Sequence, residues 1–209
     1  MLCGYMFLDR ANGNSRWYNV GGAGDPRRNV RHDVKHYKGV FPAAITPMSR
    51  KDGKVNEEAF RAVMEMNIRA GVDGFWTAGG TGESVYLTDE ENRRIAEISA
   101  DQNKGRTTVI MQVGAATTAR AAKNAENAAK AGVEAICALP PHFFNPGHDA
   151  VVEYYRVVGA AANLPLFVYN LPIATGIEIT PALMAKIKEK VPQLVGLKHA
   201  SMDYGAMVD

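Results

Sequence analysis

The sequence predicts an α/β fold of the (β/α)8 TIM-barrel type, incomplete, with about six βα units. Short and nearly continuous apolar runs indicate parallel strands buried on both faces, and a segment with helical periodicity separates each run from the next. A doubly wound sheet would show the same alternation but would concentrate its site at one switch point. Here polar residues follow several strands, which favours a barrel whose strand ends meet at one mouth. These residues are Thr46, Thr81 to Ser84, Tyr169, Asn170 and Lys198.

The six strands are expected in the apolar runs at 39–48, 72–80, 107–115, 133–140, 164–172 and 194–198. Helices are expected between them, at 56–71, 88–103, 117–132, 148–163 and 180–192. Asn56 and Thr88 are the expected N-caps of the first two helices, and the acidic residues after Thr88 suit the helix dipole. A complete barrel takes about 250 residues. This sequence has 209 residues and offers six strands, so we expect an incomplete barrel.

Composition divides the chain into two parts. Residues 1–38 are rich in Gly, Asn and Arg, carry a charge of +4 and show no sustained periodicity, so we expect a disordered or atypical N-terminal extension. Residues 39–209 carry a charge of −2 and are expected to form a partial TIM-barrel domain. No basic stripe indicates a nucleic-acid partner, and no apolar run approaches the ~20 residues of a membrane span. We expect a cytoplasmic protein, with a mitochondrial location left open.

Cysteine and histidine usage predicts no metal site and no cofactor. Cys3 and Cys137 lie far apart, without the spacing of a disulfide framework or a zinc site. Cys137 lies in an apolar run and is expected to be a small buried hydrophobic residue. His142 and His199 are single histidines without carboxylates at metal-binding spacing, and we expect them to be solvated.

Lys198 raises the question of function, because it lies within the apolar run of the last strand, in "VGLKHAS". A buried ammonium is costly, so there are two interpretations. The side chain extends to an exposed strand end, or its environment lowers its pKa and the neutral amine is used as a nucleophile. Desolvation by Val195 and Leu197 would favour the second interpretation.

Two further segments bear on this choice. "GGTGES", from Gly79 to Ser84, lies between a strand and a helix, and its N–H groups could form an anion-binding nest; the alternative is a plain glycine-rich turn. Its residues fit neither a P-loop nor a dinucleotide fingerprint. Tyr169, at the end of the fifth strand, could pack in the core or carry a proton. An amine, a phenol and an anion nest at one mouth would make a Schiff-base site for a carbonyl substrate.

From Tyr37 onward the chain resembles the dihydrodipicolinate synthase / N-acetylneuraminate lyase family of class I aldolases. The matching stretches, in the order of the family, are "GVFPAAITPM", "GGTGESVYLTDEE", "YNLPIATG" and "GLKHAS". The resemblance implies a lysine imine with pyruvate or another 2-oxo acid, formed by Lys198, with Tyr169 as the acid/base. It implies that Gly80, Thr81 and Gly82 hold the carboxylate of that acid, and that the completed barrel is a homo-oligomer, a homotetramer in this family.

Three departures from the synthase branch of the family concern the substrate. Gly80 stands where the synthase has a relay threonine, Phe143 and Phe144 stand where it has a relay tyrosine, and Ala174 stands where it has an arginine. These departures favour a lyase for a sugar acid or a hydroxy-2-oxo acid. The alternatives are a catalytically inactive or incomplete fragment of such an enzyme, a 4-hydroxy-tetrahydrodipicolinate synthase and a deoxy-oxo-glucarate dehydratase. The stretch "AGGTGE" of this chain resembles the corresponding motif of the dehydratase.

Overall fold

The computed structural model describes residues 37–201, in which five parallel strands form one sheet. Each strand pairs with the next one in the sequence, in the order β1-β2-β3-β4-β5. Consecutive order is that of a barrel wall, whereas a doubly wound sheet reverses its order at a switch point. The predicted barrel type is therefore confirmed. The strands are β1 Gly74–Thr77, β2 Thr108–Gln112, β3 Ala135–Ala138, β4 Leu166–Asn170 and β5 Leu194–His199.

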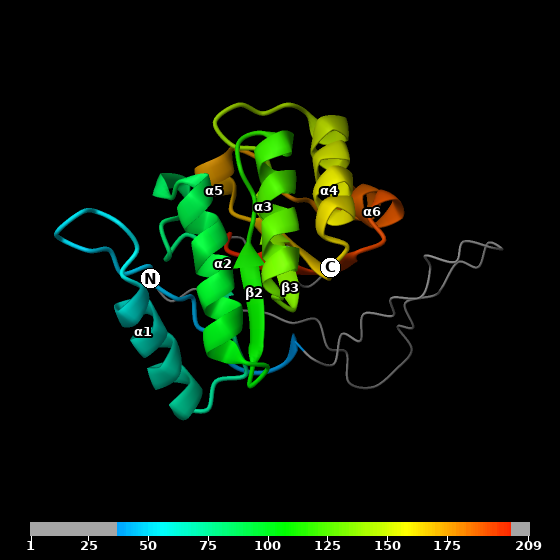
Figure 1. Ribbon diagram of the computed structural model, residues 1–209. Helices are drawn as coiled ribbons and strands as arrows, with labels where there is room; N and C mark the ends of the chain where they lie inside the picture. The colour runs from blue at the N-terminus through cyan, green and yellow to red at the C-terminus, as the bar shows by residue number, and fades with distance from the viewer. Residues whose placement is uncertain (1–36, 202–209) are drawn as a thin grey trace.

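The long helices cover one face of this sheet (Figure 1). Each packs beside the next, α1 against α2, α2 against α3, α3 against α4, and α4 against α6. Their apolar sides and one face of the strands enclose the larger core, which includes Phe60, Ile95 and Ile136. The helices are α1 Glu57–Arg69, α2 Asp89–Asn103, α3 Thr118–Ala131, α4 His148–Ala162 and α6 Pro181–Lys190.

The opposite face of the sheet bears a second cluster, which we call the lumen cluster because it corresponds to the inside of the barrel wall. No residue of a long helix belongs to it. Its buried members are Tyr37, Phe41, Trp76, Ile110, Ala135, Cys137, Leu139, Phe167 and Tyr169. The sheet therefore separates a helix-covered core from an interior lined mainly by its own side chains.

The first expected strand, 39–48, is an irregular edge of the sheet rather than a sixth strand. It runs parallel to β1 with one bridge, between Ala43 and Trp76. The N–H of Ala44 donates to Trp76 O at 2.9 Å, and the N–H of Trp76 donates to Pro42 O at 3.0 Å. Proline lacks an N–H, so Pro42 and Pro47 interrupt a regular ladder.

The expected helix starts are confirmed. The side chain of Asn56 accepts a hydrogen bond from the Ala59 N–H at 3.0 Å, and Thr88 forms a reciprocal capping box with Glu91. Two short helices were not expected, η2 at Ser84–Tyr86 and α5 at Pro172–Thr175. Both are single turns, too short to show a helical period in the sequence.

The extension expected at 1–38 lies outside the described residues except for Tyr37 and Lys38. The ring of Tyr37 is buried and meets Phe167 edge-on, with 5.0 Å between centroids. Within residues 37–201 no helix has the length and apolar character needed to cross a membrane. The same residues contain no cluster of three or more His, Cys, Asp or Glu suited to a metal ion.

Candidate active site

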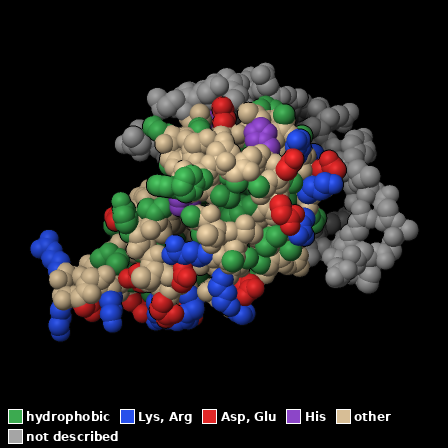
Figure 2. All heavy atoms as spheres, turned by 90° about the horizontal axis from the view of Figure 1, so that it is seen from above, with side chains coloured by type: hydrophobic (Ala, Val, Ile, Leu, Met, Phe, Trp, Pro, Cys, Tyr) green, Lys and Arg blue, Asp and Glu red, His purple; other side chains and the backbone are tan. Residues whose placement is uncertain are grey.

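The carboxyl ends of the strands lie at the end of the molecule that Figure 2 shows from above. The connecting segments after β1, β3 and β4 expose large apolar side chains here, among them Tyr86, Phe143 and Ile173. Charged side chains gather along the lower edge of Figure 2 and, in a smaller group, on its right side. Ion pairs such as Arg61–Asp101 and Arg94–Glu57 join α1 to α2. The mouth of the barrel is thus more apolar than the outer helical surface.

Lys198 is buried at this mouth. It lies on β5 directly opposite Tyr169 of β4, and only 6% of its surface is exposed. Its Nζ lies 4.1 Å from the ring centroid of Tyr169 and 4.9 Å from that of Trp76 on β1. Of the two interpretations of this lysine, the structure excludes extension to an exposed strand end.

The side chains that remove Lys198 from water differ from those expected. Val195 does pack against the lumen cluster, but Leu197 packs against the helix-covered core on the other face. Successive residues of a strand point to opposite faces, so the immediate neighbour Leu197 cannot enclose the amine. Trp76 and Tyr169, from other strands, take that place.

The glycine loop from Gly79 to Ser84 faces both Lys198 and Tyr169. A Cβ placed on Gly79 would lie 3.9 Å from Lys198 Nζ, and one on Gly80 would lie 4.0 Å from the Tyr169 hydroxyl. Because these glycines carry no side chain, space remains between the loop, the amine and the phenol. Within the described part of the chain, the N–H groups of residues 80–82 donate to no protein acceptor, as a nest for an anion requires.

The backbone in and next to this loop has two strained residues, and a hydrogen bond from Thr46 holds the loop in place. Ala78 and Glu83 have positive φ angles of 50° and 59°, which non-glycine residues rarely adopt. The hydroxyl of Thr46 donates to Gly82 O at 2.8 Å, which ties the loop to the segment along β1. Sequence reasoning noted Thr46 as a polar residue after a strand but gave it no role.

The other two predicted site residues, Thr81 and Gly82, differ in how far they are exposed to solvent. Thr81 is exposed to solvent. Gly82 is buried, with Ala44 O only 3.1 Å from the position of a Cβ. The structure therefore unites Lys198, Tyr169 and Gly80, while Thr81 could reach a ligand only on the solvent side.

Two further residues hold the strand ends beside the lysine. The N–H of Ile179 donates to Asn170 Oδ1 at 3.0 Å, so the Nδ2 group of Asn170 is turned toward His199 Nδ1, at 3.3 Å. Because an amide Nδ2 group can only donate, His199 Nδ1 is the acceptor in this pair. His199 is buried, so the expectation of a solvated histidine was wrong. A strand-end position was the available signal, and it was overlooked.

Cys137 is buried in the lumen cluster, as expected. Burial raises the pKa of its thiol to about 12, although the charge of Lys198 opposes this shift. The residues that depart from the synthase pattern lie nearer the surface. Phe143 and Phe144 are exposed and meet edge-on, with 4.8 Å between centroids, and Ala174 lies in α5.

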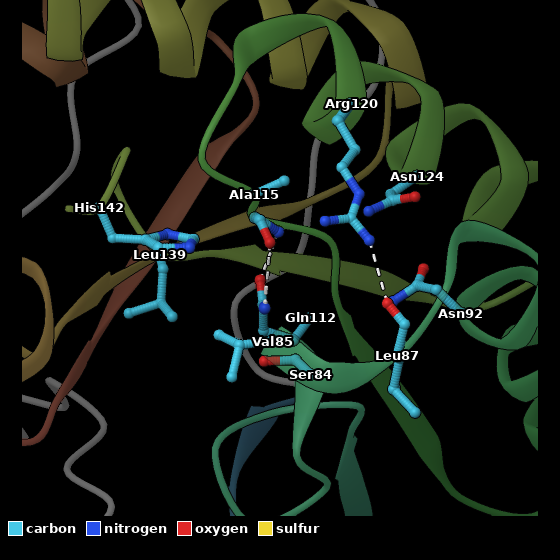
Figure 3. Close-up of a pocket in the computed structure, with 11 residues that line it drawn as sticks. Ser84, Val85, Leu87, Asn92, Gln112, Ala115, Arg120, Asn124, Leu139 and His142 are labelled. Atoms are coloured by element: carbon cyan, nitrogen blue, oxygen red, sulfur yellow. Dashed lines mark hydrogen bonds between the residues drawn. The ribbon is translucent and has the colours of Figure 1, made fainter. Parts of the chain in front are cut away.

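A separate polar cavity of about 30 Å³ lies between the segments that follow β1, β2 and β3 (Figure 3). Arg120 crosses it, donating to Leu87 O at 3.0 Å and pairing with Asp89. In the described structure, Asn124 Oδ1 and His142 Nδ1 are buried there without a protein partner. A cavity of this size and polarity suits a water molecule.

Comparison with known proteins agrees with this architecture. The model of the "Dihydrodipicolinate synthetase family" matches residues 36–209. The 4-hydroxy-tetrahydrodipicolinate synthase of Phenylobacterium zucineum is 35% identical over 167 residues, which make up 80% of this chain and 56% of that protein.

Solved structures of similar proteins share this fold. A catalytic lysine mutant of the Ruminococcus gnavus sialic acid aldolase has a TM-score of 0.78 at 29% identity, over 81% of this chain and 55% of that one. The dihydrodipicolinate synthase from Aquifex aeolicus has a TM-score of 0.78 at 27% identity, over 82% of this chain and 58% of that one. The chain spans about half the length of the relatives it matches. It belongs to the dihydrodipicolinate synthetase family.

Proposed function

We propose that the chain carries the imine-forming site of a class I aldolase or lyase that acts on pyruvate or another 2-oxo acid. The observation that carries this proposal is the common position of three groups. The amine of Lys198 and the hydroxyl of Tyr169 both face the glycine loop, within 4.0 Å of where side-chain atoms of Gly79 and Gly80 would lie. A nucleophile, a proton carrier and an anion nest thus border one space.

The chemistry follows from these positions. The neutral amine of Lys198 bonds to the keto carbon. The carbonyl oxygen leaves as water with one proton from the amine and one from an acid, a role that Tyr169 would fill, and the second amine proton stays on the nitrogen of the cationic imine. Tyr169, opposite Lys198 in the β4–β5 pair, would carry protons to and from the reacting carbon and oxygen. The N–H groups of Gly80, Thr81 and Gly82 would bind the carboxylate.

For the second half of the substrate we propose a sugar acid or a hydroxy-2-oxo acid. Gly80 lacks a hydroxyl, Phe143 and Phe144 lack a phenol, and Ala174 lacks a positive charge. The synthase is the second candidate, because curated relatives bear that name, and deoxy-oxo-glucarate dehydratase is the third. A panel of 2-oxo acids and aldehydes tests this choice, and formation of the synthase product from pyruvate and its aldehyde partner would contradict the lyase assignment.

We also propose a cytoplasmic homo-oligomer for the completed barrel. Tyr86, Phe143, Phe144 and Ile173 are exposed apolar side chains on segments at the mouth, where a second copy could cover them. Sedimentation of the purified protein measures the oligomeric state, and a monomer at all concentrations would contradict this assembly.

Reductive trapping tests the imine directly. Incubation with pyruvate and borohydride should add the reduced pyruvate adduct at Lys198, as located by peptide mass spectrometry. Lys198→Met should remove the adduct, whereas Lys190→Met, at an exposed lysine of α6, should not. No adduct on the wild-type chain would favour the alternative of an inactive or incomplete fragment.

A further inference from the structure

Lys198 has an aromatic neighbour to which neither the sequence motifs nor the family comparison assigns a role. Nζ lies 4.9 Å from the centroid of the Trp76 ring and 4.1 Å from that of Tyr169. Both distances fall within the ~6 Å over which the face of an aromatic ring attracts a cation. The indole of Trp76 therefore faces the atom on which the imine would form.

Trp76 is held firmly in this position. Only 3% of its surface is exposed, and its backbone bonds to Pro42 and Ala44 along the edge segment. Phe167 meets the indole edge-on, at 5.3 Å between centroids and 76° between planes. The ring thus has its orientation before a substrate arrives, and no reorganisation is required when charge develops at Nζ.

We propose that the indole face of Trp76 stabilises the protonated imine that Lys198 forms with a 2-oxo acid. This inference rests on the imine function proposed above. When the amine nitrogen bonds to the keto carbon, water leaves with one amine proton and one proton from the acid, Tyr169, and the second amine proton must stay on nitrogen if the imine is to withdraw electrons. An imine nitrogen is less basic than an amine, and burial disfavours its charged form further. A ring face opposes this loss of the proton.

The buried members of the lumen cluster on the described strands are aromatic or aliphatic, apart from one thiol. From β3 comes Cys137, whose thiol has a pKa of about 12 and stays uncharged at lower pH. From β2 the lumen cluster contributes Ile110, and from β4 Tyr169, which is present in every variant compared below. From β1 comes Trp76 itself, and the adjoining loop contributes Gly79, which has no side chain.

Cyanoborohydride gives the sharpest test, because it reduces a protonated imine much faster than a neutral imine. We would measure the rate of pyruvate trapping at Lys198 against pH, and take the alkaline pH at which the rate falls to half. Trp76→Leu should lower this midpoint by about one pH unit, the shift expected for loss of a desolvated cation–π contact. Trp76→Phe retains a ring and should lower it by less.

Phe75→Leu is the matched control, because Phe75 is the preceding residue of β1 and is fully buried on the opposite face. It should leave the midpoint unchanged even where it lowers stability.

In a Trp17→Phe background, quenching of Trp76 fluorescence by pyruvate should accompany trapping.

The outcomes separate the two proposals. A wild-type midpoint in Trp76→Leu, with normal trapping, overturns the role of Trp76 and leaves the imine function standing. No adduct on the wild-type chain at any pH overturns both. If circular dichroism shows that Trp76→Leu does not fold, Trp76→Phe decides, and a midpoint equal to that of the wild type overturns the proposal.

Discussion

Glycine is required at two positions of the loop beside Lys198 for different reasons. At Gly80 the nearest atom to an added Cβ is the Tyr169 hydroxyl, at 4.0 Å, so the missing side chain leaves room for a ligand. At Gly82 an added Cβ would lie 3.1 Å from Ala44 O and from Thr46 Oγ1, and backbone there cannot move freely. The first glycine thus concerns the site and the second concerns the fold.

Alanine substitutions should separate these two requirements. Gly82→Ala should lower the free energy of unfolding by about 1–3 kcal/mol, because it overpacks a buried backbone contact. Gly80→Ala should change it by less than about 0.5 kcal/mol. Urea denaturation measures both values, and equal losses in the two variants would contradict the contacts described.

The buried thiol of Cys137 should be unreactive in the folded protein. With a pKa of about 12, roughly one thiol in ten thousand is ionised at pH 8, and only the thiolate is alkylated. In a Cys3→Ser background, iodoacetamide should modify Cys137 only after unfolding in guanidinium. Modification at similar rates in the native and unfolded protein would show that the lumen is open to reagents.

The residues found from the sequence were those with a chemical anomaly. Lys198 stood out as a cation in an apolar run, and the glycine loop stood out by composition. Trp76 was missed and Thr46 was noted without a role, because both roles depend on contacts between segments that are distant in the sequence. Alternation of side chains along 72–80 could have placed Trp76 and Phe75 on opposite faces of the sheet. It could not have shown which of the two faces lines the lumen.

Among the elements, the helices matched their sequence signals more closely than the strands. Helix starts depend on local side chains, and Asn56, Thr88 and Thr180 each accept a hydrogen bond from the first turn. Strand pairing depends on distant partners. The segment 39–48 has an apolar composition, but its prolines limit it to an edge with a single bridge.

Removal of one cap should have a defined cost. Thr88→Ala should lower the melting temperature by about 2–4 °C, since it removes the hydroxyl that accepts from Glu91 N–H at 3.2 Å and with it the capping box. Thr118→Ala, in the first turn of α3, is the control, because Thr117 is the cap of that helix. Equal shifts in the two variants, measured by thermal denaturation, would contradict a capping role for Thr88.

At the scale of the whole molecule, one sheet separates two chemically different interiors. The helix-covered core is built from aliphatic and aromatic side chains, whereas the lumen cluster adjoins Lys198 and the glycine loop. Alternation of side chains along parallel strands produces this division. The order of the strands could be predicted from the polar residues that follow several strands, because these favoured a barrel over a doubly wound sheet, but the face that each residue occupies required the structure.

The helix-covered core should dominate stability. Ile136→Ala, in the middle of β3 and fully buried, should lower the free energy of unfolding by about 2–5 kcal/mol. Val40→Ala, at an exposed position, should change it by less than about 0.5 kcal/mol. A loss below about 1 kcal/mol for Ile136→Ala in chemical denaturation would contradict the packing of this layer.

The central claim is that Lys198 and Tyr169 act on one bound 2-oxo acid, and exchange of the pyruvate methyl protons in D2O tests it most directly. A protonated imine loses a methyl proton to form an enamine, so proton NMR should show the methyl signal decaying in the presence of the wild-type protein. Lys198→Met and Tyr169→Phe should each abolish this decay, while Lys190→Met should leave it unchanged. Decay that persists undiminished in Lys198→Met, or no decay with the wild type, would contradict the account.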